Sequence, residues 1–160
     1  MKYQLLSKEQ FEELHKEFST FLATQKIDKK SWDAIKENKP KKAITQLENF
    51  SDLVWEEVIR KTEYLEHYSK DSINLFHCKL QTINRIVVRI ENKDINLQEK
   101  KGLDWFLDNS NDPTIQYFKG EKDYATSRNE EIFKLIEQGA VLANETLFNG
   151  ISQLIKPATS

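Results

Sequence analysis

The sequence has few of the residues that support covalent or phosphate chemistry. It contains one Cys, three His, four Gly and three Pro in 160 residues. The single cysteine, Cys78, excludes an internal disulfide and is typical of a protein kept in a reducing compartment. Four glycines leave little material for phosphate-binding loops, and neither the P-loop nor the dinucleotide-binding glycine pattern occurs. The sequence therefore predicts no cofactor, and it favours a protein that is not an enzyme.

Long apolar runs are also absent. No segment approaches the roughly 18 uninterrupted apolar residues of a membrane span, and the start MKYQLLSKEQ lacks the apolar stretch of a signal peptide. We therefore expect a cytoplasmic protein with no membrane partner.

Charge of one sign does not dominate either. The chain has 24 basic and 26 acidic residues, with a formal net charge of -2, so it lacks the basic excess typical of non-specific nucleic-acid binding. No DNA-specific signal is present. The chain length and its 38% of hydrophobic residues are sufficient for one core. We expect a single globular domain over residues 1–156 and a flexible tail over residues 157–160.

The stretch Ser72–Ile90, SINLFHCKLQTINRIVVRI, predicts the fold class. Two β-branched runs with alternating polarity are joined there by a short polar link, as in a β-hairpin. In the second run Ile86 and Val88 fall on one face and Arg85 and Arg89 on the other, which is typical of a strand with one buried side. The sequence therefore predicts an α+β domain with helices flanking a small antiparallel sheet.

The segments before and after this hairpin have apolar residues at helical spacing. Ser7 begins a capping box with Gln10, and the apolar stripe that follows predicts a helix to about Thr24. A helix beginning at Pro40 is expected to reach Tyr64 or beyond. Further elements are expected as helices over 28–38, 96–107, 127–139 and 145–155, and as a third strand over 114–118.

Several segments resemble a known family. The segments EFSTFLATQKID, FSDLVWEEVI, YLEHYSKDSINLFHC and RNEEIFKLIEQGA are similar to an uncharacterised family of flavobacterial (Bacteroidetes) cytoplasmic proteins, and the resemblance covers nearly the whole chain. The resemblance implies a bacterial, cytoplasmic, stand-alone domain. It brings no catalytic or binding residues with it.

One polar cluster suggests metal chemistry. On a helix, Glu63, Glu66 and His67 would share a face at spacings of three and four residues, close to the arrangement of helical zinc proteases. A metal-dependent hydrolase at these residues is therefore one hypothesis. The simpler interpretation is a polar helix end whose His67 interacts with the last carbonyl groups.

A lysine-rich segment suggests a second hypothesis. Residues 26–42 contain seven lysines and three acidic residues. Such a segment could contact phosphates, so an RNA- or ribosome-associated factor is a possible function. The simpler interpretation is a solvated, salt-bridged surface. The lysines proposed to bind RNA are Lys29, Lys30, Lys39, Lys41 and Lys42.

The preferred hypothesis is a non-enzymatic cytoplasmic module for protein interaction or regulation. Its partner would be another protein, bound at the sheet face or in a helical groove. We expect the strand Ile83–Ile90 to lie at an exposed sheet edge, where it could accept a partner strand. Arg85 and Arg89 are the residues predicted to bind the partner.

Overall fold

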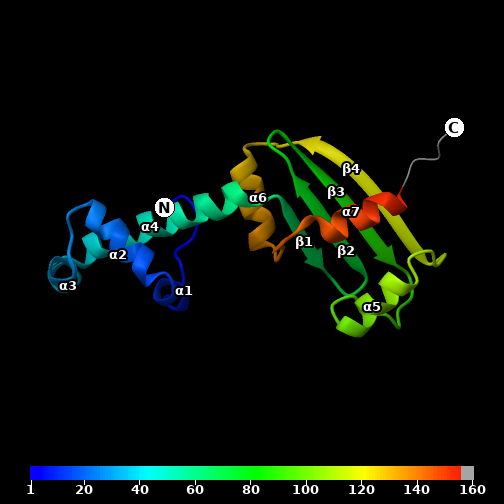
Figure 1. Cartoon of the computed structure of the whole chain (residues 1–160), viewed down its shortest axis with the longest axis horizontal. Coiled ribbons are helices and arrows are strands. Elements are labelled where there is room, and N and C mark those ends of the chain that lie inside the picture. Colours follow the sequence, from blue (N-terminus) through cyan, green and yellow to red (C-terminus); the bar gives the residue numbers. More distant parts are fainter. Residues whose placement is uncertain (156–160) are drawn as a thin grey trace. The chain divides into compact units, whose positions relative to one another are not determined.

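A computed structural model describes residues 1–155 and contains seven helices and five strands within them (Figure 1). The α+β class predicted from the sequence is confirmed. The chain divides into two compact units, Met1–Arg60 and Lys61–Ser160. The assignment of residues 1–156 to one domain stays a prediction, and the tail predicted over 157–160 lies outside the described residues. No helix within residues 1–155 is both long and apolar enough to cross a membrane.

The first unit consists of helices α1 Lys8–Glu13, α2 His15–Thr24, α3 Lys29–Asn38 and most of α4 Pro40–Lys61. The capping box at Ser7 is confirmed in both directions, because Ser7 accepts from the Gln10 N–H and Gln10 accepts from the Ser7 N–H. The single helix predicted to Thr24 is divided at Leu14. Next to this break His15 Nδ1 lies 3.0 Å from the Glu12 carbonyl oxygen.

Aromatic side chains form the core of this unit. Phe50 on α4 is buried, and its ring lies 5.0 Å from Phe18 and 5.5 Å from Phe21, measured between centroids. Trp32 on α3 meets Phe18 edge-on at 5.3 Å. Ser51 is completely buried and satisfies its hydroxyl by accepting from the Leu6 N–H and donating to the Leu47 carbonyl. The apolar stripes predicted on these helices therefore meet in one cluster.

The second unit is built on a five-stranded antiparallel sheet with the order β4-β3-β2-β1-β5. The predicted hairpin is confirmed. The strands are β1 Tyr64–Tyr68, β2 Ser72–Cys78, β3 Thr82–Ile90, β4 Ile115–Asp123 and β5 Val141–Ala143.

Two expectations about this sheet are wrong. The helix predicted to reach Tyr64 ends at Lys61, and Tyr64–Tyr68 forms β1, because this segment pairs with β2 on one side and β5 on the other. In addition β3 is an interior strand, since β4 pairs along its whole length. The strand Ile83–Ile90 therefore has no free edge, and the sheet edges are β4 and β5.

One sheet face carries the main core. Ile86, Val88 and Ile90 are buried on it, as the alternation predicted, together with Ile73 and Leu75 of β2. Helices α5 Lys100–Asp108 and α7 Glu145–Leu154 supply the buried residues that cover this face, which include Phe106, Phe148 and Ile151. The last helix thus packs back onto the sheet.

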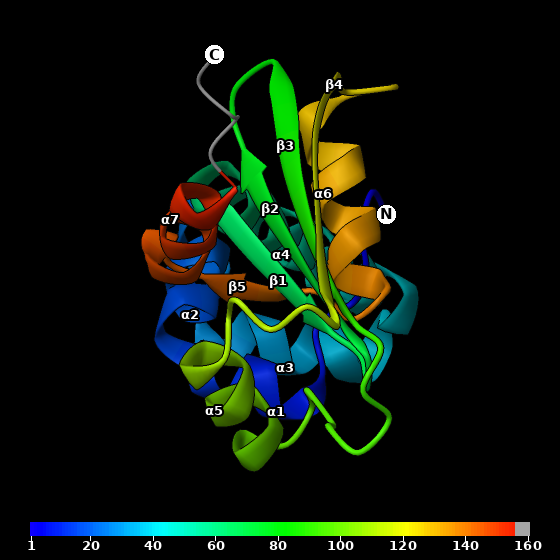
Figure 2. The same ribbon diagram turned by 90° about the vertical axis from the view of Figure 1, so that its right-hand side faces the viewer.

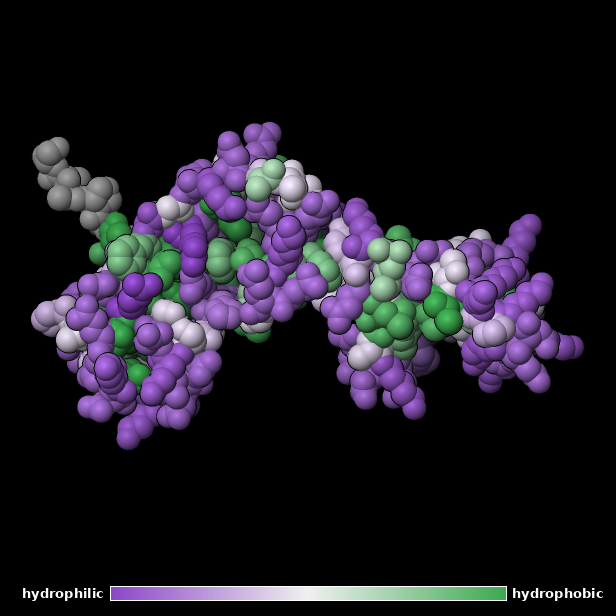
Figure 3. All heavy atoms as spheres, turned by 180° about the vertical axis from the view of Figure 1, so that it is seen from behind, coloured by the Kyte–Doolittle hydropathy of each residue, from purple (hydrophilic) through white to green (hydrophobic). Residues whose placement is uncertain are grey.

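The opposite sheet face is covered only in part. Helix α6, Arg128–Glu137, lies on the other side of the sheet from α5 and α7 (Figure 2). It buries Ile132 and Phe133, and the strand residues Leu65, Phe76 and Ile83 are buried on this face. Gly139 follows the end of this helix with a φ of 105°, which is typical of a glycine just after a helix C-terminus. Hydrophilic side chains cover most of the surface visible in Figure 3, with smaller apolar areas among them.

Candidate functional site

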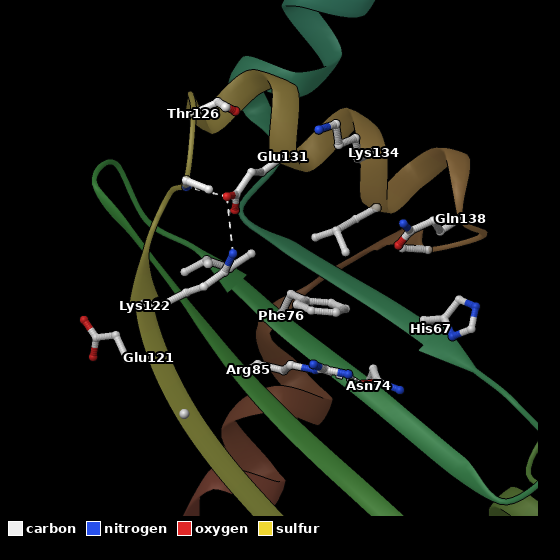
Figure 4. Close-up of a pocket in the computed structure, with 15 residues that line it drawn as sticks. His67, Asn74, Phe76, Arg85, Glu121, Lys122, Thr126, Glu131, Lys134 and Gln138 are labelled. Carbon is white, nitrogen blue, oxygen red and sulfur yellow. Dashed lines mark hydrogen bonds and ion pairs between the residues drawn. The ribbon is translucent and has the colours of Figure 1, made fainter.

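A groove lies between α6 and the partly covered sheet face (Figure 4). Its volume is about 760 Å³, within the range of ligand-binding pockets. Strands β1 to β4 form its floor and α6 forms one wall. Its polar lining includes Asn74 and Arg85 from the sheet and Lys134 from the helix.

Arg85 in the groove is exposed, and two other side chains hold its guanidinium in place. Its Nε and Nη2 both donate to Asn74 Oδ1, at 3.0 and 2.5 Å, and its guanidinium carbon lies 5.7 Å from the centre of the Phe76 ring. Phe76 is itself only 8% exposed, so the platform under the guanidinium is fixed. The remaining Arg85 donors have no protein partner within residues 1–155 and are available to an anion.

Arg89 repeats this arrangement further along β3. It lies four residues after Arg85 on the same face, about 13 Å away along the strand. Its guanidinium carbon lies 5.9 Å from the centre of the Phe118 ring, which is 49% exposed. The two residues that the sequence analysis selected therefore form a row of cations on aromatic supports.

The α6 wall contributes mixed charge. Lys122 Nζ lies 3.2 Å from Glu131 Oε1, and the same carboxylate accepts from the Ala125 N–H. Lys134 and Arg85 have no carboxylate within 4.0 Å in the described part of the chain. Because the Glu131 charge is balanced by Lys122, the groove offers its free positive charge at these two side chains.

The start of α6 is attached to the end of the sheet. The Arg128 guanidinium donates to the carbonyl oxygens of Thr62, Cys78 and Lys79, and the Tyr124 hydroxyl donates to Lys79 at 2.7 Å. The Ser127 side chain caps the helix by accepting from the backbone N–H of Glu130. These bonds fix the position of the α6 wall over the strands.

The helical metal site predicted at Glu63, Glu66 and His67 does not form as expected. Glu66 and His67 are neighbours on strand β1, so their side chains point to opposite faces. Glu66 accepts from the Tyr68 hydroxyl at 2.6 Å, whereas His67 lines the groove. No group of three or more His, Cys, Asp or Glu side chains suited to a metal ion occurs among residues 1–155.

The lysines proposed for RNA binding lie in the first unit. Lys29 and Lys30 begin α3, Lys39 connects α3 to α4, and Lys41 and Lys42 stand in the first turn of α4. All five are exposed. Their role in RNA binding stays a prediction.

The groove also contains residues that sequence reasoning did not select. Asn74, Phe76 and Lys134 belong to segments whose apolar periodicity described the core and gave no sign of ligand binding. The sequence does contain a signal for Asn74 and Phe76. They alternate along β2 on the face opposite Ile73 and Leu75, so the hairpin register places them on the same face as Arg85.

Cys78 should be an unreactive thiol. Burial raises its pKa to about 11, and the nearby Arg128 charge only partly opposes this effect. At pH 8 the thiolate fraction is then roughly 100-fold below that of an ordinary cysteine. We expect iodoacetamide to modify native Cys78 at least about 100-fold more slowly than the urea-unfolded chain, as followed by mass spectrometry. Equal rates in the two states would contradict this assignment.

Comparisons with known proteins give one match. Residues 1–156 match the model of a family described as "Family of unknown function (DUF6495)". No curated protein and no solved structure matches the chain significantly. Because the match covers nearly all of the 160 residues, the chain belongs to this family of unknown function.

Proposed function

We propose that this protein is a non-enzymatic protein-interaction module that binds an acidic segment of a partner protein on the α6 side of its sheet. Arg85 carries the proposal. Its guanidinium is held by Asn74 and Phe76 and has no carboxylate partner in residues 1–155. Because the side chain is already ordered, it loses less conformational entropy when a ligand binds. Arg89 and Lys134 supply further positive charge on the same face.

The length of the cationic row favours an extended ligand. Arg85 and Arg89 are about 13 Å apart along β3, which equals four residues of an extended peptide. A partner segment with acidic side chains at positions i and i+4 would reach both guanidinium groups. Carboxylates suit this role because arginine binds them through two parallel hydrogen bonds.

Other features favour a peptide over RNA at this face. The aromatic rings that could stack with bases already lie under the guanidinium groups of Arg85 and Arg89. Lys122 on the groove wall is already paired with Glu131, which leaves less positive charge for a continuous phosphate chain. Bacterial origin and a cytoplasmic location stay predictions.

The test is selection of a random peptide display library on the wild-type protein, with counter-selection on the double variant Arg85→Glu/Arg89→Glu. We expect the enriched peptides to contain paired acidic residues. Binding should weaken at least tenfold, measured by fluorescence anisotropy, when either arginine is reversed in charge or the peptide acids become Gln. Asn74→Ala should weaken binding less, because it releases the guanidinium without removing its charge.

Lys101→Glu provides the matched control. It makes the same change in charge at an exposed position of α5, the helix that covers the opposite sheet face, and should leave peptide binding unchanged. Selection of neutral peptides, or equal binding by the wild type and the double variant, would refute the proposal. Binding of a single-stranded RNA oligonucleotide that depends on Arg85 and Arg89 would instead assign this face to RNA.

A further inference from the structure

Within residues 1–155, strand β4 leaves one long edge of the sheet without a partner strand. It has nine residues and pairs only with β3, whereas the edge strand β5 has three. An exposed strand of this length can template pairing with another chain. Figure 1 shows β4 along the outer side of the sheet, with no other strand beyond it.

The register shows which backbone groups face outward. The Glu91 N–H donates to the Thr114 carbonyl, and these residues continue the β3–β4 register by one position beyond its last pair, Ile90 and Ile115. Hydrogen-bonded pairs recur at every second residue. The backbone N–H and C=O groups of the even-numbered β4 residues therefore bond to β3, and those of the odd-numbered residues point away from β3. The Ile115 N–H is satisfied by Asp112. The backbone N–H groups of Tyr117, Lys119 and Glu121 have no hydrogen-bond partner within residues 1–155.

We propose that a second copy of this chain pairs with this edge, β4 against β4, antiparallel about a two-fold axis at Gly120. In this register Lys119 of each copy stands opposite Glu121 of the other, which forms two cross-strand ion pairs. The two sheets then form one continuous ten-stranded sheet.

Neighbouring registers are less favourable. A shift of the axis to Lys119 or to Glu121 brings two identical charges face to face. A two-fold axis midway between two residues would place an odd-numbered residue opposite an even-numbered one. The backbone groups of the even-numbered residue already bond to β3, so the hydrogen bonds between the copies would not form. An axis at Phe118 forms no ion pair and places Ile115 opposite Glu121.

Gly120 suits the axis sterically. Residues at a pair that is not hydrogen-bonded have Cα atoms only about 4.5 Å apart. A Cβ built on Gly120 meets no atom within 4 Å, so the surroundings of this position are open. Lys119 would exchange its present bond to Ser152 Oγ, 3.1 Å long and at the surface, for the ion pair.

Sedimentation equilibrium of the full chain and its charge-reversal variants tests the pairing. We expect the wild type to dimerise, and Lys119→Glu or Glu121→Lys to raise the dimer dissociation constant at least tenfold, since each places like charges opposite one another. An equimolar mixture of the two single variants should restore a heterodimer, because every facing pair is then of opposite charge. The double variant Lys119→Glu/Glu121→Lys should restore the homodimer.

A backbone probe separates strand pairing from surface charge. Lys119→Pro removes an N–H that points outward and leaves the bonds to β3 intact, so the fold should persist while the dimer is lost. Circular dichroism confirms folding of each variant. The proposal fails if the wild type stays monomeric up to about 100 µM, or if the mixture of single variants stays monomeric. It does not depend on Arg85 or Arg89, so peptide binding and dimerisation can fail separately.

Discussion

Replacing Gly102 with alanine should destabilise the protein by roughly 3 kcal/mol, the upper end of the cost of overpacking. Intrinsic helix propensity predicts the opposite, because Gly102 lies within α5 and alanine is favoured there by about 1 kcal/mol. The structure indicates that the substitution lowers the stability instead. A Cβ at this position would overlap the backbone carbonyl oxygen of Asn96 and come within 2.5 Å of its carbon.

Backbone atoms cannot rotate away as a side chain can. Asn96 is followed by Leu97, which is 2% exposed and whose N–H donates to the Lys70 carbonyl. Moving the Asn96 carbonyl therefore disturbs both a buried side chain and a bond to the β1–β2 connection. The measurement is the free energy of unfolding from urea titration monitored by tryptophan fluorescence.

Gly150→Ala is the matched control. Gly150 also lies within a helix, α7, but a Cβ there would meet nothing within 4 Å. We expect this variant to gain about 0.5–1 kcal/mol of stability. If Gly102→Ala were as stable as Gly150→Ala, the close approach of Asn96 to α5 would be wrong.

Replacing Phe106 with alanine should cost about 3–5 kcal/mol, the range for large-to-small changes of a buried aromatic residue. Phe106 is 0% exposed in the core between α5 and the sheet, and its ring lies 6.4 Å from that of Tyr117 on β4. Its removal leaves a cavity beneath a short helix that has few other fully buried residues. Urea titration again measures the loss.

The adjacent residue tests whether burial causes this loss. Leu107 is 52% exposed, so Leu107→Ala should change the free energy of unfolding by less than about 0.5 kcal/mol. Phe106→Leu should lie between the wild type and Phe106→Ala, because it fills part of the cavity. Equal losses from Phe106→Ala and Leu107→Ala would show that α5 does not pack as described.

These stability variants also support the functional tests. Phe106 belongs to the core on one sheet face, whereas Arg85 and Arg89 lie on the other. A charge reversal at the arginines removes only exposed contacts and should therefore lower the free energy of unfolding much less than Phe106→Ala does. Loss of peptide binding in those variants then reports on the surface and not on the fold.

Local sequence patterns were sufficient for elements whose periodicity has one interpretation. The β3 alternation placed Ile86 and Val88 in the core and Arg85 and Arg89 outside it, as found. The Ser7 capping box and the final helix were also predicted correctly. In each case neighbouring residues along the chain supply the interactions that define the element.

The segment Tyr64–Tyr68 shows where such patterns fail. Leu65 continues the apolar stripe of α4, so the helical interpretation was consistent with the sequence. The segment is nevertheless a strand, because its backbone groups pair with β2 and β5, and β5 lies more than 70 residues later. That error placed Glu66 and His67 on one face, when a strand separates them.

The sequence by itself determined the α+β class, the hairpin and the two faces of β3, because these depend on side-chain periodicity over a few residues. Only the tertiary structure decided that β3 is interior, that β4 is the free edge, and that Asn74 and Phe76 support Arg85 beside α6. Strand order and the position of α6 depend on contacts between residues far apart in the chain. No local pattern encodes such contacts, because the free energy that selects them comes from burial and pairing in the assembled sheet.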